Sequence, residues 1–80
     1  MHRNDLTQKY LWELGRKICT LRKSKNLTQA NLAELINYSI ETISDVENGK
    51  VSPKITFIIS LADCFDTDPN YFLPGKGDDK

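Results

Sequence analysis

Apolar residues recur every three or four positions along most of this chain, and no segment alternates apolar and polar residues as a strand does. The first stripe runs from Tyr10 to about Lys25. Its members are Leu11, Leu14, Ile18 and Leu21. This spacing predicts an amphipathic helix with one face against a core. Gly15 lies inside this helix at a cost of about 1 kcal/mol relative to alanine, so we expect a neighbouring helix to approach closely there.

A short helix is predicted after Leu27. Thr28 is a suitable N-cap because its hydroxyl can accept a hydrogen bond from an unpaired N–H of the first turn. Leu27 and Leu32 are placed to pack together as a hydrophobic staple. The apolar stripe of this helix consists of Leu32, Ala33, Leu35 and Ile36. Asn37 follows, and asparagine tolerates the left-handed conformation that a sharp corner requires.

A second short helix is predicted over residues 39–48. Ser39 is its N-cap, and Ile43 and Val46 face inward. The pair Asn48-Gly49 can take positive φ and end the helix. Two short helices joined by a tight turn form a helix-turn-helix, whose second helix enters the major groove of DNA.

Two further helices complete the pattern. Ser52 as N-cap and Pro53 at the first helical position predict the start of a helix that ends near Phe65. It carries two adjacent apolar stripes: Ile55, Ile58, Ala62 and Phe65 in one, and Phe57, Leu61 and Cys64 in the other. After the polar residues Asp66 to Asp68, a last short helix is predicted from Pro69 to Leu73. The prediction is therefore an all-α fold of five helices.

The length of 80 residues allows one small domain. Residues 1–10 are polar and are expected to form a loose N-terminal arm or an early turn of the first helix. Residues 11–73 form the domain, and residues 74–80 are expected to be a flexible tail. No apolar run is long enough to span a membrane, and the N-terminus lacks the apolar centre of a signal peptide. We therefore expect a cytoplasmic protein in which Cys19 and Cys64 stay reduced.

An enzyme is not expected, because the residues that catalysis needs are missing. The single histidine, His2, lies in the polar N-terminal segment. The chain has no glycine-rich phosphate loop and no metal-ligand cluster, and Asp63, Asp66 and Asp68 lack the glycine and closing glutamate of a calcium loop. We expect no catalytic residue, metal, cofactor or small-molecule ligand, and we interpret these aspartates as helix-end charges and caps.

The central segment closely resembles the phage repressor and Cro-type helix-turn-helix family. The matching residues are Leu27-Thr28-Gln29, Leu32-Ala33, Ile43 and Glu47-Asn48-Gly49-Lys50. The resemblance extends over roughly residues 11–73, with Asn37 where the family usually has glycine. It implies a compact five-helix bundle of the lambda-repressor-like DNA-binding type. It also implies a small transcriptional regulator, such as a repressor, that binds a roughly palindromic operator in double-stranded DNA as a homodimer. In similar proteins the glutamate before Asn-Gly pairs with an arginine late in the first helix, which implies a buried pair between Arg22 and Glu47.

Two sets of residues are predicted to contact DNA. The residues assigned to phosphates are Thr28, Gln29, Lys50, Ser52 and Lys54. A helix N-terminus at Ser52-Pro53 would add its N–H groups and dipole. The residues assigned to base edges are Ser39, Ile40, Glu41, Thr42, Ser44 and Asp45. Gln29 is alternatively an exposed helix residue without a contact.

The distribution of charge leaves two readings open. Residues 1–30 carry seven bases against two acids, whereas residues 31–49 carry four acids and no base. Glu41 and Asp45 either read bases or pair with lysines away from DNA. The alternative function is a protein-interaction module, an antitoxin or adaptor that keeps the fold while its acidic face binds a protein.

A homodimer is predicted to form through the C-terminal third of the chain. This third holds more apolar residues than a core of five short helices should need, namely Phe57, Ile58, Ile59, Phe65, Tyr71, Phe72 and Leu73. Some of them should therefore cover a partner.

Overall fold

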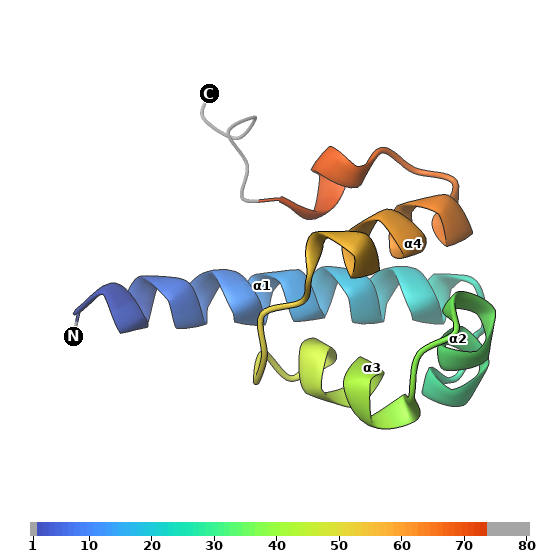
Figure 1. Ribbon diagram of the computed structural model, residues 1–80, viewed down its shortest axis with the longest axis horizontal. Helices are drawn as coiled ribbons and strands as arrows, with labels where there is room; N and C mark the ends of the chain where they lie inside the picture. Colours follow the sequence, from blue (N-terminus) through green and yellow to red (C-terminus); the bar gives the residue numbers. More distant parts are fainter. Residues whose placement is uncertain (1, 74–80) are drawn as a thin grey trace.

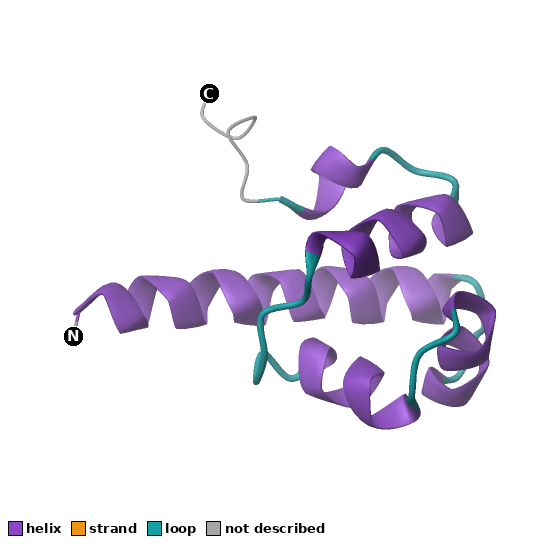
Figure 2. Cartoon of the chain, viewed as in Figure 1, coloured by secondary structure: helices purple, strands orange, loops and turns teal. Residues whose placement is uncertain are grey.

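The computed structural model describes the backbone of residues 2–73 and the side chains of residues 6–73 (Figure 1). The predicted tail, residues 74–80, lies outside the described residues. The helices are α1 (His2–Ser24), α2 (Gln29–Ile36), α3 (Ile40–Glu47), α4 (Ile55–Phe65) and the short 3-10 helix η1 (Pro69–Phe72). The part of the chain that the structure describes contains no strand (Figure 2), so the all-α prediction is confirmed at this level.

The prediction of five α-helices is wrong, because the last element is a single 3-10 turn. The N–H of Tyr71 donates to the carbonyl of Asp68 (2.9 Å), and the N–H of Leu73 donates to that of Asn70 (3.1 Å). These are bonds between residues three apart. The segment has only four residues, which is too short for a series of α-helical hydrogen bonds between residues four apart.

One predicted helix start is also wrong, and for another the sequence leaves two possibilities open. α1 begins at His2, so residues 2–10 are an early part of the first helix and not a loose arm. No proline or glycine interrupts residues 2–10, and the Gln8 amide donates to the carbonyl of Gly49 (2.8 Å), which ties this part of α1 to the body. α4 begins at Ile55 with Lys54 as an N-cap that makes no side-chain capping bond. The chain before it stays extended as it crosses from the end of α3 to α4 (Figure 1).

α1 runs along the whole molecule, with α3 packed against it on one side and η1 on the other, while α2 packs against both α3 and α4 (Figure 1). All of these elements contribute to one core, whose most deeply buried side chains include Ile18, Leu32, Ile43, Phe57 and Leu61. Cys19 is a buried free thiol and Cys64 a half-buried one. The buried apolar residues of the described chain form one cluster.

The observed burial of side chains contradicts the predictions for two groups of apolar residues. Leu35, placed in the buried stripe of α2, is 61% exposed, because the short helix buries only the narrower face of Leu32, Ala33 and Ile36. Four of the residues assigned to a surplus in the C-terminal third are core residues: Phe57, Ile58, Phe65 and Phe72. The small domain uses them to close its own interior, which leaves Ile59, Tyr71 and Leu73 exposed.

Gly15 allows α1 and α3 to touch. A Cβ at this position would lie 2.4 Å from the carbonyl oxygen of Glu47 and 2.6 Å from that of Val46, closer than atoms can approach. The expected close approach of a neighbouring helix is therefore confirmed, and the neighbour is the C-terminal end of α3.

Candidate nucleic-acid interface

The unit of α2, turn and α3 is organised by local hydrogen bonds. The Thr28 hydroxyl accepts from the N–H of Asn31 (2.9 Å), and the Asn31 side chain accepts from the N–H of Thr28 (3.0 Å), which forms a capping box. Asn37 ends α2 in the left-handed conformation, with φ 64°. Ser39 caps α3 by accepting from the N–H of Thr42 (3.1 Å). The predicted caps and corner residue are confirmed.

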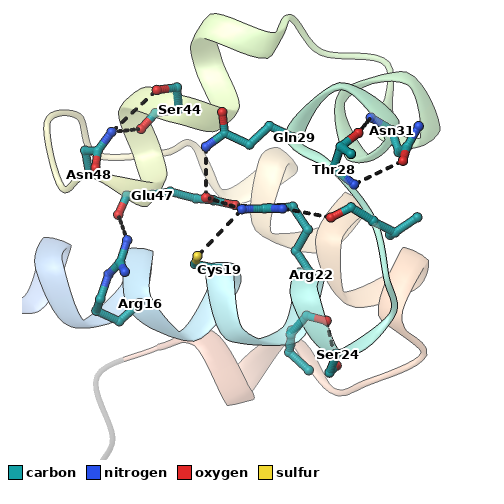
Figure 3. A network of polar contacts seen from close by, with 12 residues as sticks. Arg16, Cys19, Arg22, Ser24, Thr28, Gln29, Asn31, Ser44, Glu47 and Asn48 are labelled. Carbon is teal, nitrogen blue, oxygen red and sulfur yellow. Dashed lines mark hydrogen bonds and ion pairs between the residues drawn. The ribbon is translucent and has the colours of Figure 1, made fainter.

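Arg22 and Glu47 form an ion pair that joins the end of α1 to the end of α3 (Figure 3). The Arg22 Nε and Nη2 donate to the two carboxylate oxygens at 2.7 and 3.0 Å, and Nη1 donates to the carbonyl of Leu27 at 2.7 Å. Both side chains are buried. The guanidinium thus connects α1, the segment before α2, and α3.

The electrostatics of the pair follow from its burial. Burial by itself would raise the pKa of Glu47, but the hydrogen bonds from Arg22 and Gln29 outweigh it, and the pKa lies below its ordinary value. The hydrogen bond to Glu47 raises the pKa of Arg22. Both groups therefore remain charged at neutral pH.

Gln29 is half-buried, and its amide nitrogen donates to Glu47 Oε1 (3.0 Å; Figure 3). The predicted phosphate contact would have to use the second amide proton. The bond to Glu47 fixes the orientation of this amide at the start of α2.

The other phosphate candidates lie on the connector between α3 and α4. Lys50, Ser52 and Lys54 are exposed. The predicted helix N-terminus at Ser52-Pro53 does not exist, because α4 begins at Ile55, so Ser52 lies in extended chain before the helix. Lys54 occupies the N-cap, where the free N–H groups of the first turn of α4 lie beside its backbone.

The six candidates for base readout differ in their exposure and in whether their side chains already make hydrogen bonds within the protein. Ile40 and Glu41 are exposed, and Ser44 and Asp45 are half-exposed. The hydroxyls of Ser39 and Thr42 hydrogen-bond each other at 2.9 Å, in addition to the cap. The Ser44 hydroxyl accepts from the Asn48 amide (3.4 Å). Ile40, Glu41 and Asp45 are therefore the side chains among these six for which the described structure shows no hydrogen bond.

Some contacts around the site were not anticipated from the sequence. Arg16 donates to the backbone carbonyl of Glu47 (3.0 Å) while its guanidinium lies 4.7 Å from the ring centre of Trp12. The Asn48 amide donates to the carbonyl of Ser44 (3.0 Å). The contacts of Arg16 with α3 have no signal in the sequence, because they depend on how α1 and α3 cross.

Among the described residues, no group of three or more His, Cys, Asp or Glu side chains could hold a metal ion. No helix in the described part of the chain is long and apolar enough to cross a membrane.

Comparisons with known proteins place the fold. A family model described as Helix-turn-helix matches residues 20–72. HTH-type transcriptional regulators of Rickettsia conorii and Rickettsia prowazekii are each 29% identical over 73 residues, 91% of this chain. This chain spans 58% and 56% of the length of those relatives.

Two solved structures are similar. The restriction-modification controller protein C.AhdI from Aeromonas hydrophila superposes with a TM-score of 0.77 at 27% identity, over 82% of this chain and 96% of that chain. An HTH_3 family transcriptional regulator from Vibrio cholerae gives a TM-score of 0.75 at 23% identity, over 82% of this chain and 37% of that chain, which is a likeness of fold.

Proposed function

Because this chain belongs to the Helix-turn-helix family, we propose that it is a transcriptional regulator that binds specific DNA sequences through α3. The observation that carries the proposal is the geometry of α3. Its first turn is capped by Ser39 and exposes Ile40 and Glu41, while Glu47 at its other end is anchored to α1 and α2. A rigid, capped helix with an exposed N-terminal turn is what this docking mode inserts into the major groove.

The contacts divide into positioning and readout. Thr28 and Gln29 at the start of α2, and Lys50, Ser52 and Lys54 on the connector, are assigned to phosphates, which set the register of the protein on the duplex. Base readout is assigned to α3. Ile40 offers a surface to a thymine methyl, and Glu41 can accept from cytosine N4. Ser39, Thr42, Ser44 and Asp45 complete the groove-facing surface.

The protein is proposed to act as a homodimer on a roughly palindromic operator. One recognition helix reads only a few base pairs, so two copies bound about one helical turn apart supply the length that specificity needs. The likeness to a restriction-modification controller supports a role in gene control.

The acidic character of the α2–α3 face favours one second candidate. Residues 31–49 contain four acids and no base, and Glu34 and Glu41 are exposed. A basic segment of a protein partner would fit such a face, as in an antitoxin or adaptor.

Selection from genomic fragments, followed by affinity measurements on the selected duplex, tests the proposal. We expect one enriched motif with two related halves, and affinity that falls steeply between about 50 and 200 mM salt, because each phosphate contact releases counterions. Lys50→Ala should weaken binding, and Lys23→Ala, in the last turn of α1, is the matched surface control. Failure to enrich any motif, together with capture of a protein by the α3 face, would instead support the second candidate.

A further inference from the structure

The N-terminal half of α1 carries exposed apolar side chains that DNA binding does not use. Leu6 is 55% exposed and Tyr10, one turn further on, is 42% exposed. This half of α1 extends beyond the rest of the molecule (Figure 1) and precedes the residues that match the family model. Helical turns in proteins are stabilised mainly by packing of their apolar face, and here the described chain covers only part of that face.

A groove of about 700 Å³, lined by both apolar and charged residues, begins at Tyr10. Tyr10 and Leu14 line it from α1, and Ile55 and Leu73 line it from the start of α4 and the end of η1. Ile55 is 58% exposed. The wall formed by η1 is held in place by Lys17, whose Nζ donates to the carbonyl of Tyr71 (2.8 Å) and lies 4.9 Å from the centre of its ring.

We propose that the stripe of Leu6 and Tyr10 on one copy of this chain packs into the groove of a second copy, and the reverse, in a two-fold symmetric dimer. The stripe and the groove adjoin each other on one molecule. A two-fold axis beside Tyr10 therefore places the stripe of each copy in the groove of the other. The two contacts form one closed interface. This inference rests on the proposed homodimer and specifies which residues form its interface.

The charges around the groove select an antiparallel arrangement of the two α1 helices. Lys9 and Glu13 lie one turn apart and both line the groove. When two copies of α1 cross antiparallel near Tyr10, each Lys9 faces the Glu13 of the second copy, so the opposite charges meet twice. A parallel arrangement would bring like charges together, which is unfavourable. This self-complementarity identifies the occupant of the groove as a second copy.

The first test measures the dimer dissociation constant of the full chain by sedimentation. Leu6→Glu places a charge in the apolar interface of both copies, and we expect the dimer to weaken at least tenfold. Leu35→Glu is the matched control, because Leu35 is 61% exposed on α2, away from the groove, and should leave the dimer unchanged. Circular dichroism checks that both variants keep their helix content.

The second test exchanges charges at the rim. Lys9→Glu alone and Glu13→Lys alone should each weaken the dimer severalfold, and the double variant should recover the affinity because the pairs are restored in reverse. A dimer that is insensitive to Leu6→Glu and disrupted by Ile59→Glu would overturn the proposal in favour of the outer face of α4. A monomeric wild type, or a groove that binds a small molecule in place of the second copy, would also overturn it.

The two proposals fail separately. Loss of the dimer in Leu6→Glu without any operator for the wild type would sustain this interface and reject the proposed function. Specific binding of DNA by a dimer that Leu6→Glu leaves intact would sustain the function and reject this interface.

Discussion

At the scale of single residues, one buried carboxylate, that of Glu47, holds the unit of α2, turn and α3 to the rest of the protein. Glu47 accepts hydrogen bonds from Arg22 of α1 and Gln29 of α2, and its backbone carbonyl accepts from Arg16. Taking two charges out of water costs free energy that only good geometry and further hydrogen bonds repay. The pair is therefore sensitive to loss of either partner.

Removing one partner of this pair should destabilise the protein strongly. Arg22→Met or Glu47→Leu leaves a buried charge without its counterpart, at a typical cost of about 3–5 kcal/mol. The double variant should lose less free energy of unfolding than the sum of the single losses. Urea denaturation of all four proteins measures the coupling. Additive losses would contradict the assignment of one structural unit.

The division between positioning and readout makes a second prediction at this scale. Lys54→Ala should weaken binding to all duplexes alike and reduce the salt slope by about one unit, because a phosphate contact carries no base information. Glu41→Ala should change the preference at one base pair by about 1–3 kcal/mol, because it removes an acceptor for cytosine.

Binding of both variants to an operator library at two salt concentrations checks these assignments. Equal tightening of all sequences by Glu41→Ala would show that this carboxylate only repels phosphates. A changed base preference in Lys54→Ala would show that the two surfaces are assigned wrongly.

At the scale of the helices, the position of α3 depends on its contact with α1. Gly15 lies under the last carbonyl groups of α3, and the Gln8 and Arg16 side chains bond carbonyls of the same region. These contacts set how far α3 stands from the body of the protein, and so how its exposed first turn is presented.

Gly15→Ala should therefore destabilise the protein, although alanine is the better helix former by about 1 kcal/mol. The new Cβ would meet backbone oxygen atoms at 2.4 and 2.6 Å, and these atoms can move only if the helices separate. We expect a loss of about 1–3 kcal/mol, the usual cost of overpacking. Thermal denaturation measures it, with Thr20→Ala on the exposed face of α1 as control. A stabilised Gly15→Ala protein would mean that α1 and α3 are not in this contact.

At the scale of the whole molecule, the carboxylate of Glu47 makes the free energy of unfolding depend on pH. The folded-state pKa of Glu47 is lowered from its ordinary value of 4.5. Its contribution to stability is therefore fully present above that value and is lost as the pH falls through the folded-state pKa, because the unfolded chain takes up the proton first.

Stability should consequently decline on the acid side of about pH 4.5 and be little affected by this group near neutrality. Glu47→Gln should be less stable at neutral pH and should show a shallower decline in acid. Urea midpoints across the acid range measure this, and Glu41→Gln, on the exposed face of α3, is the control. If the stability of Glu47→Gln fell with pH as steeply as that of the wild type, Glu47 would not be a source of the pH dependence.

Features that depend on neighbours in the sequence were predictable. The caps at Thr28 and Ser39 and the left-handed corner at Asn37 were read correctly, because each is a bond or backbone conformation within one turn of chain. The inward side of α3 followed from helical spacing, since Ile43 and Val46 are buried. The motif itself was recognisable from the same local pattern.

Tertiary structure decided what depends on contacts between distant segments. The extension of α1 to His2, the start of α4 at Ile55 and the exposure of Leu35 all depend on which surfaces the helices cover when they pack. The bond of Gln29 to Glu47 is of the same kind, because it joins residues that are 18 positions apart. Sequence by itself thus determined the all-helical elements and the motif, because these arise from local hydrogen bonds and apolar periodicity. Packing determined the helix limits and the partners of the polar side chains, because these arise only when separate helices meet.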